Sequence, residues 1–297
     1  RTLAAHGATV YLGCRNTRKC AQAADAINAA VVARPSPGRA VVPAALDLSK
    51  LESVAAFAAA CPRDINVLVN NAGYSPSSGD GPTADGFAPG FGSMHLGHWL
   101  LTEQVLARRT GSPPTRVVNV ASGTHYTCIS FDCFDEAWWS HGVHAAADSF
   151  AYVRAKAANV LHAWALPHKH GHPGPLVEAL SVNLGWVGTN IQPWMRWTQP
   201  LGLTRSPAYG IAPIIHAIVV PVTAQNNGRV VNGLLGITRP FVETNKALLV
   251  SMMATRWGKP ERARETSSFT HEEAASLRDR LWDESERLVQ GAQRTEE

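Results

Sequence analysis

Short apolar segments rich in β-branched residues alternate along the chain with longer segments whose apolar residues recur at helical spacing. The short segments predict buried strands and the longer ones predict helices. Strands and helices that alternate in this way indicate βαβ units, in which helices cover both faces of a parallel sheet. The predicted strands are 8–14, 41–46, 65–69, 116–120 and 180–183, and the predicted helices are 1–6, 17–30, 51–60, 94–107 and 151–166.

Residues typical of turns and caps separate these elements. Gly7 suits the left-handed position after the first helix, and Ser49 is the expected N-cap of helix 51–60. Residues 74–89 are rich in Gly, Pro, Ser and Asp, which predicts a loop. The pattern therefore predicts a single α/β domain over residues 1–297, a doubly wound parallel sheet of Rossmann type.

Composition narrows the class of protein. The 297 residues are 45% hydrophobic and 17% charged, which is typical of an ordered globular protein. The formal net charge of +4 is too small and too evenly spread to indicate nucleic-acid binding. No apolar run is long enough to span a bilayer, and no secretory signal is present. The five cysteines have neither a CxxC nor a disulfide-scaffold spacing, which favours a reducing compartment.

Several chemically suggestive residues directly follow predicted strands. They are Arg15, Asp47, residues 71–73, Ser122 and residues 185–189. In a doubly wound sheet, ligands bind beyond the carboxyl ends of the strands. Asn, Gly and Ser also populate ordinary turns, but five such groups in succession at one edge favour a binding site.

Tyr152 and Lys156 lie four residues apart, and this spacing places both on one face of the predicted helix 151–166. A phenol has a pKa of about 10, and an ammonium one turn away is expected to lower it. Such a pair can exchange a proton with a substrate oxygen. The motif alone is also compatible with a solvated helix face.

The combination of motifs resembles the short-chain dehydrogenase/reductase family, and most of all its retinol-dehydrogenase-like branch. The segments that carry the resemblance extend over nearly the whole chain. They include Gly7–Arg15, Leu46–Leu48, Val67–Gly73, His95–Thr102, Arg116–Ser122, Ala151–Asn159 and Val187–Thr189.

The resemblance implies an oxidoreductase with Ser122, Tyr152 and Lys156 as catalytic residues. Tyr152 would exchange the proton, Lys156 would lower its pKa and bind the nicotinamide ribose, and Ser122 would hold the substrate oxygen. The resemblance also implies a set of cofactor contacts. Asp47 and Leu48 would contact the adenine; Asn71, Ala72 and Gly73 would line the cofactor; Val187 and Thr189 would contact its carboxamide or pyrophosphate.

The cofactor is expected to be NADP rather than NAD. Enzymes that prefer NAD usually place a carboxylate after the second strand, where it binds the ribose 2′-hydroxyl. Cys14 and Arg15 occupy this position here, and Arg15 is a donor suited to a phosphate.

The sequence departs from the family pattern in three places. It begins at Arg1, in what reads as the middle of a helix, so we expect the first strand and the glycine-rich phosphate loop to be missing from an incomplete N-terminus. Met94 stands where the family has an Asn that helps to hold a water in the proton relay. Leu184 precedes Gly185 where the family has Pro-Gly.

These departures leave two functional hypotheses open. One is an NADP(H)-dependent enzyme that interconverts a carbonyl and an alcohol on an apolar small molecule such as a retinoid, steroid or lipid. The other is a catalytically silent relative that acts as a binding module. We expect a cytoplasmic location or the cytosolic face of an intracellular membrane, with membrane association only through a missing N-terminus, and a homodimer is compatible with both hypotheses.

Other segments have competing interpretations. Residues 192–203, with Trp194, Met195 and Trp197, could close over an apolar substrate, pack ordinarily, or form a patch for a membrane or partner. Residues 168–172 contain three histidines but no acidic or cysteine partner, so a solvated loop is favoured over a metal site. His125 and His144 could contact substrate but are better interpreted as packing or surface residues. Residues 262–297 predict a solvated amphipathic helix.

Overall fold

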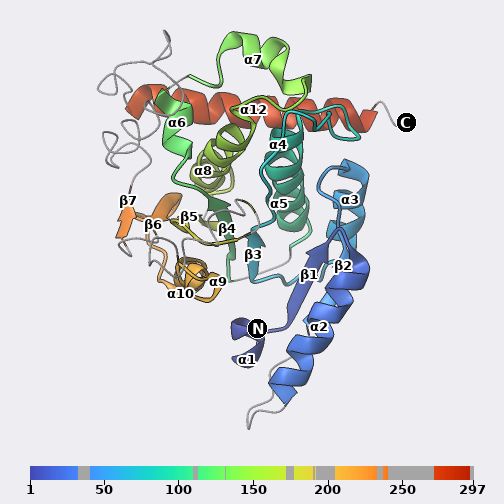
Figure 1. Ribbon diagram of the computed structural model, residues 1–297. Helices are drawn as coiled ribbons and strands as arrows, with labels where there is room; N and C mark the ends of the chain where they lie inside the picture. The colour runs from blue at the N-terminus through green and yellow to red at the C-terminus, as the bar shows by residue number, and fades with distance from the viewer. Residues whose placement is uncertain are drawn as a thin grey trace.

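The computed structural model describes residues 1–32, 41–109, 113–130, 132–171, 177–189, 191, 205–232, 237–239 and 271–294. Figure 1 shows strands and helices alternating along the chain. The strands are β1 (Val10–Cys14), β2 (Val41–Ala45), β3 (Val67–Asn70), β4 (Thr115–Ala121), β5 (Val177–Asn183), β6 (Arg229–Asn232) and β7 (Ile237–Arg239). The helices of the first half are α1 (Thr2–Ala5), α2 (Thr17–Val32), α3 (Leu51–Ala60), α4 (Pro89–Phe91), the π-helix η1 (Gly92–Leu96) and α5 (Gly97–Ala107). Those of the second half are α6 (His125–Ser130), α7 (Glu136–Ser140), the 3₁₀ turn η2 (Gly142–His144), α8 (Ala151–Lys169), α9 (Pro207–Gly210), α10 (Ala212–Val219) and α12 (His271–Arg294).

The strands form two sheets. The larger has the order β3-β4-β5-β6-β7, in which β3 to β6 are parallel and β7 is an antiparallel edge strand. The register aligns Asn70 with Asn119, and Ala121 with Asn183. The residues that follow β3, β4 and β5 therefore meet at one edge of this sheet, where the sequence predicted a binding site.

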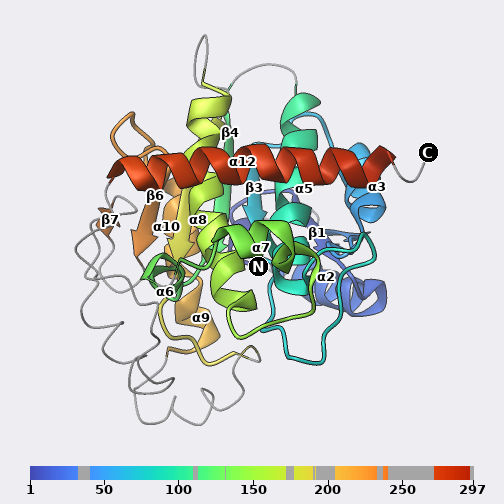
Figure 2. The ribbon, with the colours of Figure 1, turned by 90° about the horizontal axis from the view of Figure 1, so that it is seen from above.

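Helices cover both faces of the larger sheet. On one face α8 packs on β4 and β5, and on the other α10 packs on the same strands. The strand residues facing α10 form a small cluster with Ala217 of that helix, through Val118, Leu180 and Val182. Figure 2 shows α12 lying across α8 and α5 as an outer layer. The predicted C-terminal helix is thus confirmed over His271–Arg294, and it buries one face, including Leu281 and Trp282, against the core.

The smaller sheet contains β1 and β2 as a parallel pair. Ala4 of α1, Ala24 and Val31 of α2, and Val41 of β2 form its own buried cluster. Helix α3, which follows β2, packs against α5 of the larger unit, and Leu51, Val54 and Ala58 belong to the main core. This packing joins the smaller sheet to the larger one.

Two local predictions were wrong. The predicted helix 94–107 begins earlier, at Pro89, and passes through a π-turn over Gly92–Leu96 before α5. Ser49 does not cap α3, because its hydroxyl donates to the Asp47 carboxylate at 2.6 Å. Instead Asp85, from the following loop, accepts the Leu51 N–H at 3.0 Å.

The cysteines also differ from the expectation. Cys14 is joined to Cys20, and Cys128 to Cys133, each pair as a disulfide, while Cys61 is free. Both pairs lie five or six residues apart and close short local loops. In the part of the chain that the structure describes, no helix has the length and apolarity needed to cross a membrane.

Candidate functional site

Ser122 and Tyr152 meet at the carboxyl edge of the larger sheet. Ser122 directly follows β4, and Tyr152 lies in the first turn of α8, the helix that packs on β4. A side-chain hydrogen bond joins the two residues. This bond favours the ionised form of the phenol.

The ionisation of Tyr152 differs from the sequence prediction. Burial raises its pKa above the ordinary value of 10, and the hydrogen bond from Ser122 opposes this without overcoming it. Lys156 was expected to lower this pKa, but its ammonium lies 5.7 Å from the centre of the Tyr152 ring and is directed elsewhere. The prediction was wrong for this state because desolvation of the phenol dominates.

Lys156 is buried, with 3% of its surface exposed. Its Nζ donates a hydrogen bond to the carbonyl oxygen of Val120, near the end of β4, at 2.8 Å. Burial lowers the Lys156 pKa from 10.5 to about 8. The side chain therefore holds a proton that it can release near neutral pH.

Asn71, Ala72 and Gly73 form an exposed turn after β3, next to Lys156. A Cβ added to Gly73 would lie 3.2 Å from Lys156 Nζ and 3.3 Å from Met94 Sδ. A side chain at this position would therefore press on the ends of the Lys156 and Met94 side chains. The turn thus leaves exposed main chain close beside Lys156.

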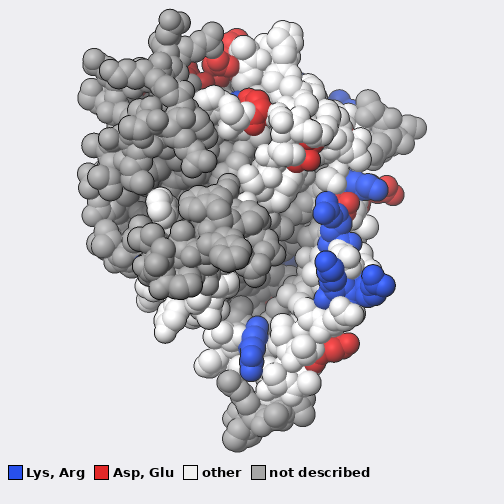
Figure 3. All heavy atoms as spheres, viewed as in Figure 1, with Lys and Arg blue, Asp and Glu red and all other residues white. Residues whose placement is uncertain are grey.

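Arg15 and Asp47 lie at the carboxyl ends of β1 and β2. Burial would raise the pKa of Asp47, but hydrogen bonds from Ser49 and the charges of Arg15 and Lys50 outweigh it and lower this pKa. Arg15 is exposed, and Figure 3 shows Lys and Arg side chains gathered between the start of α2 and α3. Leu48 is half-buried, and its carbonyl oxygen would lie 2.6 Å from a Cβ added to Gly97 of α5.

Val187 and Thr189 lie in the turn after β5, at the same edge. Val187 forms a bridge with Arg205, and the Thr189 N–H bonds to the Val187 carbonyl at 2.9 Å. The sequence did not reveal the residue that positions this turn, Asn183. Its Oδ1 accepts the N–H of Gly123 at 3.0 Å and that of Gly185 at 3.1 Å, so it ties the turn after β4 to the turn after β5.

Met94 lies within the π-helix η1, and its sulfur lies close to the Gly73 position. Its sulfur accepts the Tyr74 N–H at 3.4 Å. Its carbonyl oxygen lies 2.9 Å from His98 Nδ1. Main-chain groups in a π-turn do not follow the α-helical bonding pattern, and such turns are frequent at functional sites. Here the Met94 carbonyl oxygen is hydrogen-bonded to the His98 side chain.

A buried polar network underlies the site, and sequence patterns gave no signal of it. Asn70 Nδ2 donates to Asn119 Oδ1 at 2.8 Å, and Asn119 Nδ2 donates to the Asn159 carbonyl at 3.1 Å and lies 3.2 Å from His162 Nδ1. Asn159 Nδ2 donates to the same Val120 carbonyl that binds Lys156, at 3.3 Å. The network fixes α8 against β3 and β4, and thereby fixes Lys156.

The histidines that the sequence singled out lie in different surroundings. His125 is fully buried and bonds to the Ser122 carbonyl, and burial lowers its pKa to about 4. His144 stacks on Phe87 with a centroid separation of 5.6 Å, which is a packing role. The predicted loop 168–172 was wrong at its start, because His168 and Lys169 form the last turn of α8; His170, which follows, lies 2.9 Å from Glu103. Trp194, Met195, Trp197 and His172 lie outside the described residues, within which no group of acidic, His and Cys side chains suits a metal ion.

Comparison with known sequences gives related proteins over much of the chain. Human retinol dehydrogenase 12 is 40% identical over 168 residues, which cover 54% of this chain and 48% of the relative. Human retinol dehydrogenase 13 is 31% identical over 245 residues, which cover 78% of this chain and 71% of the relative. The chain thus spans about half the length of the first of these relatives. No protein-family model matches the sequence.

Solved structures share the fold. An uncharacterised protein from Mycobacterium paratuberculosis is 27% identical with a TM-score of 0.63, over 97% of this chain and 86% of the other. An NADPH-bound short-chain oxidoreductase from Pseudomonas aeruginosa PAO1 is 20% identical with a TM-score of 0.55, over 79% of this chain and 89% of the other. The second likeness shows the fold alone.

Proposed function

The chain belongs to the short-chain dehydrogenase/reductase family, and we propose that it is an NADP(H)-dependent oxidoreductase that interconverts a carbonyl and an alcohol on an apolar small molecule. The observation that carries this proposal is the hydrogen bond between Ser122 and Tyr152 beside a buried Lys156. All three residues lie at the edge of the sheet where doubly wound folds bind ligands.

The proposed roles follow from the contacts of each side chain. Ser122 donates a hydrogen bond to the substrate oxygen and holds it at the Tyr152 hydroxyl. Tyr152 gives its proton to that oxygen when the carbonyl is reduced and takes a proton when the alcohol is oxidised. Lys156, with a pKa lowered to about 8 by burial, is the proposed source of the proton that restores Tyr152. Because its Nζ binds the Val120 carbonyl and not the phenol, the transfer would pass through a water.

A nicotinamide cofactor fits the described residues. The turn formed by Asn71, Ala72 and Gly73 approaches Lys156 closely because Gly73 has no side chain. Asp47 and Leu48 would hold the adenine end, and Val187 and Thr189 the end near the nicotinamide. When bound, the cofactor supplies or accepts the hydride.

NADP is proposed over NAD because of charge. Arg15 is exposed after β1 and acts on the Asp47 carboxylate, and the surrounding surface is rich in Lys and Arg. A guanidinium binds a phosphate through parallel hydrogen bonds, whereas a ribose hydroxyl is better matched by a carboxylate.

An apolar substrate is supported by the aromatic residues at the same edge. Trp186, in the turn after β5, is 52% exposed, and Tyr209 of α9 is 75% exposed. The Gly210 position, next to Tyr209, lies against the Val187 side chain. Because several relatives are retinol dehydrogenases, all-trans-retinal is a suitable first probe.

Residues 1–297 are proposed to act as a single domain. Leu51, Val54 and Ala58 of α3 share one core with α5, α8 and α12. The nucleotide-facing residues of the smaller sheet are therefore held to the catalytic residues of the larger one by apolar packing.

The test is a fluorescence titration of the protein with NADPH and with NADH, followed by turnover of all-trans-retinal. We expect tighter binding of NADPH, and we expect Tyr152→Phe to bind NADPH normally but to lose at least 100-fold in kcat, in line with removal of a general acid. A Tyr152→Phe protein as active as the parent would exclude the proposed role of Tyr152.

A second candidate function, a catalytically silent binding module, is favoured by one feature of the structure. The Met94 side chain and carbonyl oxygen are both engaged within the protein, with Tyr74 and His98. Neither the side chain nor the carbonyl oxygen of Met94 is therefore available to hold a water for the proton relay. The protein would then bind NADPH but turn over neither retinal nor any member of a panel of short aldehydes and ketones, and that result would support this second function.

A further inference from the structure

A single buried arginine fastens the segment between Ser122 and Tyr152 to the helix that carries Tyr152. Arg154 lies in the second turn of α8, and only 5% of its surface is exposed. Its contacts are with the segment that leads into α8. A buried guanidinium normally makes charge-assisted hydrogen bonds with all sides of its fork, and Arg154 does so here.

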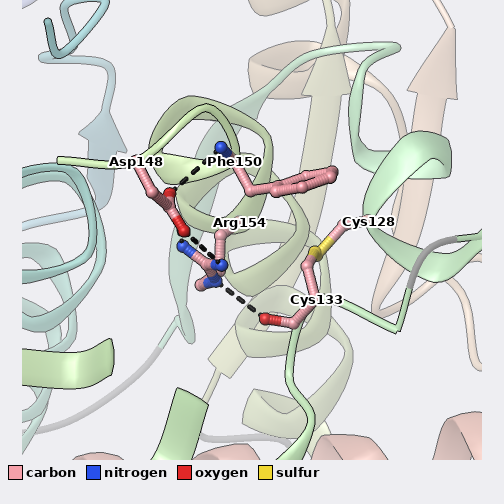
Figure 4. The surroundings of a disulfide bond; sticks show 5 residues. All are labelled: Cys128, Cys133, Asp148, Phe150 and Arg154. Atoms are coloured by element: carbon pink, nitrogen blue, oxygen red, sulfur yellow. Dashed lines mark hydrogen bonds and ion pairs between the residues drawn. A yellow bond between two sulfur atoms is a disulfide. The ribbon is translucent and has the colours of Figure 1, made fainter. Parts of the chain in front are cut away.

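Asp148 is the first partner of Arg154. The Arg154 Nη1 and Nη2 atoms donate to the two carboxylate oxygens of Asp148, each at 3.0 Å. Asp148 also holds the turn that leads into α8: its Oδ1 accepts the Phe150 N–H at 3.0 Å and its carbonyl accepts the Ala151 N–H at 3.2 Å. Figure 4 shows this arrangement, with the Asp148 carboxylate between Phe150 and Arg154. Tyr152 therefore lies between Asp148 and Arg154, in the stretch of chain that this ion pair closes.

The middle of the segment is the second partner. Arg154 Nε donates to the Cys133 carbonyl at 2.7 Å, and the guanidinium carbon lies 3.7 Å from the centre of a Trp138 ring. Cys133 is itself fixed by its disulfide with Cys128, which lies within α6, the helix that begins three residues after Ser122 (Figure 4). Arg154 thus connects the Ser122 side and the Tyr152 side of the segment.

We propose that Arg154 is a positioning residue for the reaction: by gripping Asp148, Cys133 and Trp138 it sets the Tyr152 hydroxyl against Ser122. This inference rests on the proposed function, because it assigns a consequence to the same two catalytic groups. Arg154 itself touches neither of them and acts through the turn that leads into α8. Loss of the guanidinium is expected to loosen the first turn of α8 without affecting the Asn71–Gly73 turn.

The chain offers a matched control. Arg280 of α12 also contacts helix α7, donating to Glu136 at 2.8 Å and lying 5.3 Å from the centre of a Trp139 ring. This pair is exposed, with 41% and 77% of the two side chains accessible. Arg280→Gln removes an arginine, an ion pair and a cation–π contact, but leaves the bonds of Asp148 in the turn before α8.

The first measurement compares Arg154→Gln, Arg154→Lys, Asp148→Asn and Arg280→Gln with the parent, using all-trans-retinal and NADPH well below the melting temperature of each protein. We expect Arg154→Gln to lower kcat at least 10-fold, Arg154→Lys to recover part of the loss, and Asp148→Asn to lower kcat about threefold. NADPH affinity, measured by fluorescence titration, should change less than twofold in all four variants. Arg280→Gln should keep kcat within twofold of the parent.

The second measurement is amide hydrogen exchange, which does not depend on turnover. We expect Arg154→Gln to speed exchange at residues 132–153 at least 10-fold, with β4 and α12 unchanged. If the parent turns over no retinal, the proposed substrate fails and exchange alone decides the role of Arg154. A folded Arg154→Gln protein with unchanged exchange overturns the proposal, and so does an active one with unchanged kcat. Should Arg154→Gln not fold, Asp148→Asn decides between the same outcomes.

Discussion

Lys156 Nζ lies 2.8 Å from the carbonyl oxygen of Val120, so the ammonium is bound to the end of β4 rather than to the phenol one turn earlier. The bond keeps a buried cation next to the exposed Gly73 turn. It also means that the charge is held in place at a cost in stability, since burial disfavours the protonated amine.

Replacing Lys156 by methionine should abolish turnover but stabilise the protein at neutral pH. The folded pKa of about 8 lies below the ordinary value of 10.5, so the unfolded chain binds the proton more tightly, and the parent gains stability as pH rises from 8 to 10.5. We expect Lys156→Met to raise the free energy of unfolding by about 1–3 kcal/mol at pH 7, and by less at pH 10. Urea unfolding at the two pH values measures this, and an equal effect at both would contradict the assignment.

Reversing the charge of Arg15 should change the preference between the two cofactors. Arg15→Glu places a carboxylate beside the turn after β1, where it repels a 2′-phosphate and accepts a hydrogen bond from a 2′-hydroxyl. We expect NADPH binding to weaken about 10-fold or more, by roughly the 1–3 kcal/mol of a charge-assisted contact, and NADH binding to strengthen. The exposed Arg18 gives a control: if Arg18→Glu has the same effect, the preference reflects the general charge of the surface.

The buried histidines should make the protein sensitive to acid. Burial lowers the pKa of His98 to about 4 and that of His162 to about 3, so both are neutral in the folded protein. Below pH 6.5 these histidines bind protons in the unfolded chain but not in the folded protein. The free energy of unfolding therefore falls as the pH decreases toward 4. Each histidine should cost about 1–2 kcal/mol at pH 5.

Variants of His162 test this. Its ring packs on Trp282 with a centroid separation of 5.9 Å, so Phe at this position keeps the aromatic contact. We expect the loss of unfolding free energy between pH 7.5 and pH 5 to be smaller in His162→Phe than in the parent by about 1–2 kcal/mol. Identical losses in the two proteins would show that His162 does not contribute.

The Arg116 side chain should contribute strongly to the free energy of unfolding, because it joins β4 to both α10 and β5. Its Nη1 donates to the carbonyl oxygens of Ile218 at 2.5 Å and Val220 at 2.8 Å, which end α10, and its Nε and Nη2 bind Glu178 of β5 at 2.8 and 2.6 Å. Arg116→Met leaves these acceptors without a donor, and we expect a loss of about 2–4 kcal/mol in urea unfolding. Glu178→Gln, which keeps the shape and one acceptor, should cost about 1 kcal/mol; a larger loss from Gln than from Met would refute this ordering.

The sequence predicted the order of strands and helices because period-2 and period-3.6 patterns survive wherever one face of an element is buried. It also predicted which residues gather at the sheet edge, because the carboxyl ends of parallel strands coincide. The structure brings Ser122, Tyr152 and Lys156 together on this basis. The ends of elements were less accurate: β3 runs to Asn70, one residue beyond the prediction, and α8 continues through Pro167 to Lys169.

Features that depend on contacts distant in sequence were not predictable. The N-terminus of α3 is capped by Asp85, which lies 34 residues beyond Leu51. The π-turn has no periodic signature, because it adds one residue to a helix whose apolar residues are buried all round. The burial of Arg154 depends on Cys133, Trp138 and Asp148, which lie outside α8 and earlier in the chain. The pKa of Tyr152 was misjudged because the sequence does not reveal how deeply the ring is buried.

The division of the strands into two sheets has a mechanical consequence. Among the described strands, no ladder of main-chain hydrogen bonds connects β1 to β3. The unit that carries Arg15 and Asp47 is therefore joined to the larger sheet through α3 and the turn before it. Helix α3 packs on α5, the Leu51 N–H binds Asp85, and the Ala84 N–H binds the Ser49 carbonyl. The two ends of one nucleotide would thus be held by strands of two different sheets, and a nucleotide that binds both would act as a clamp between them.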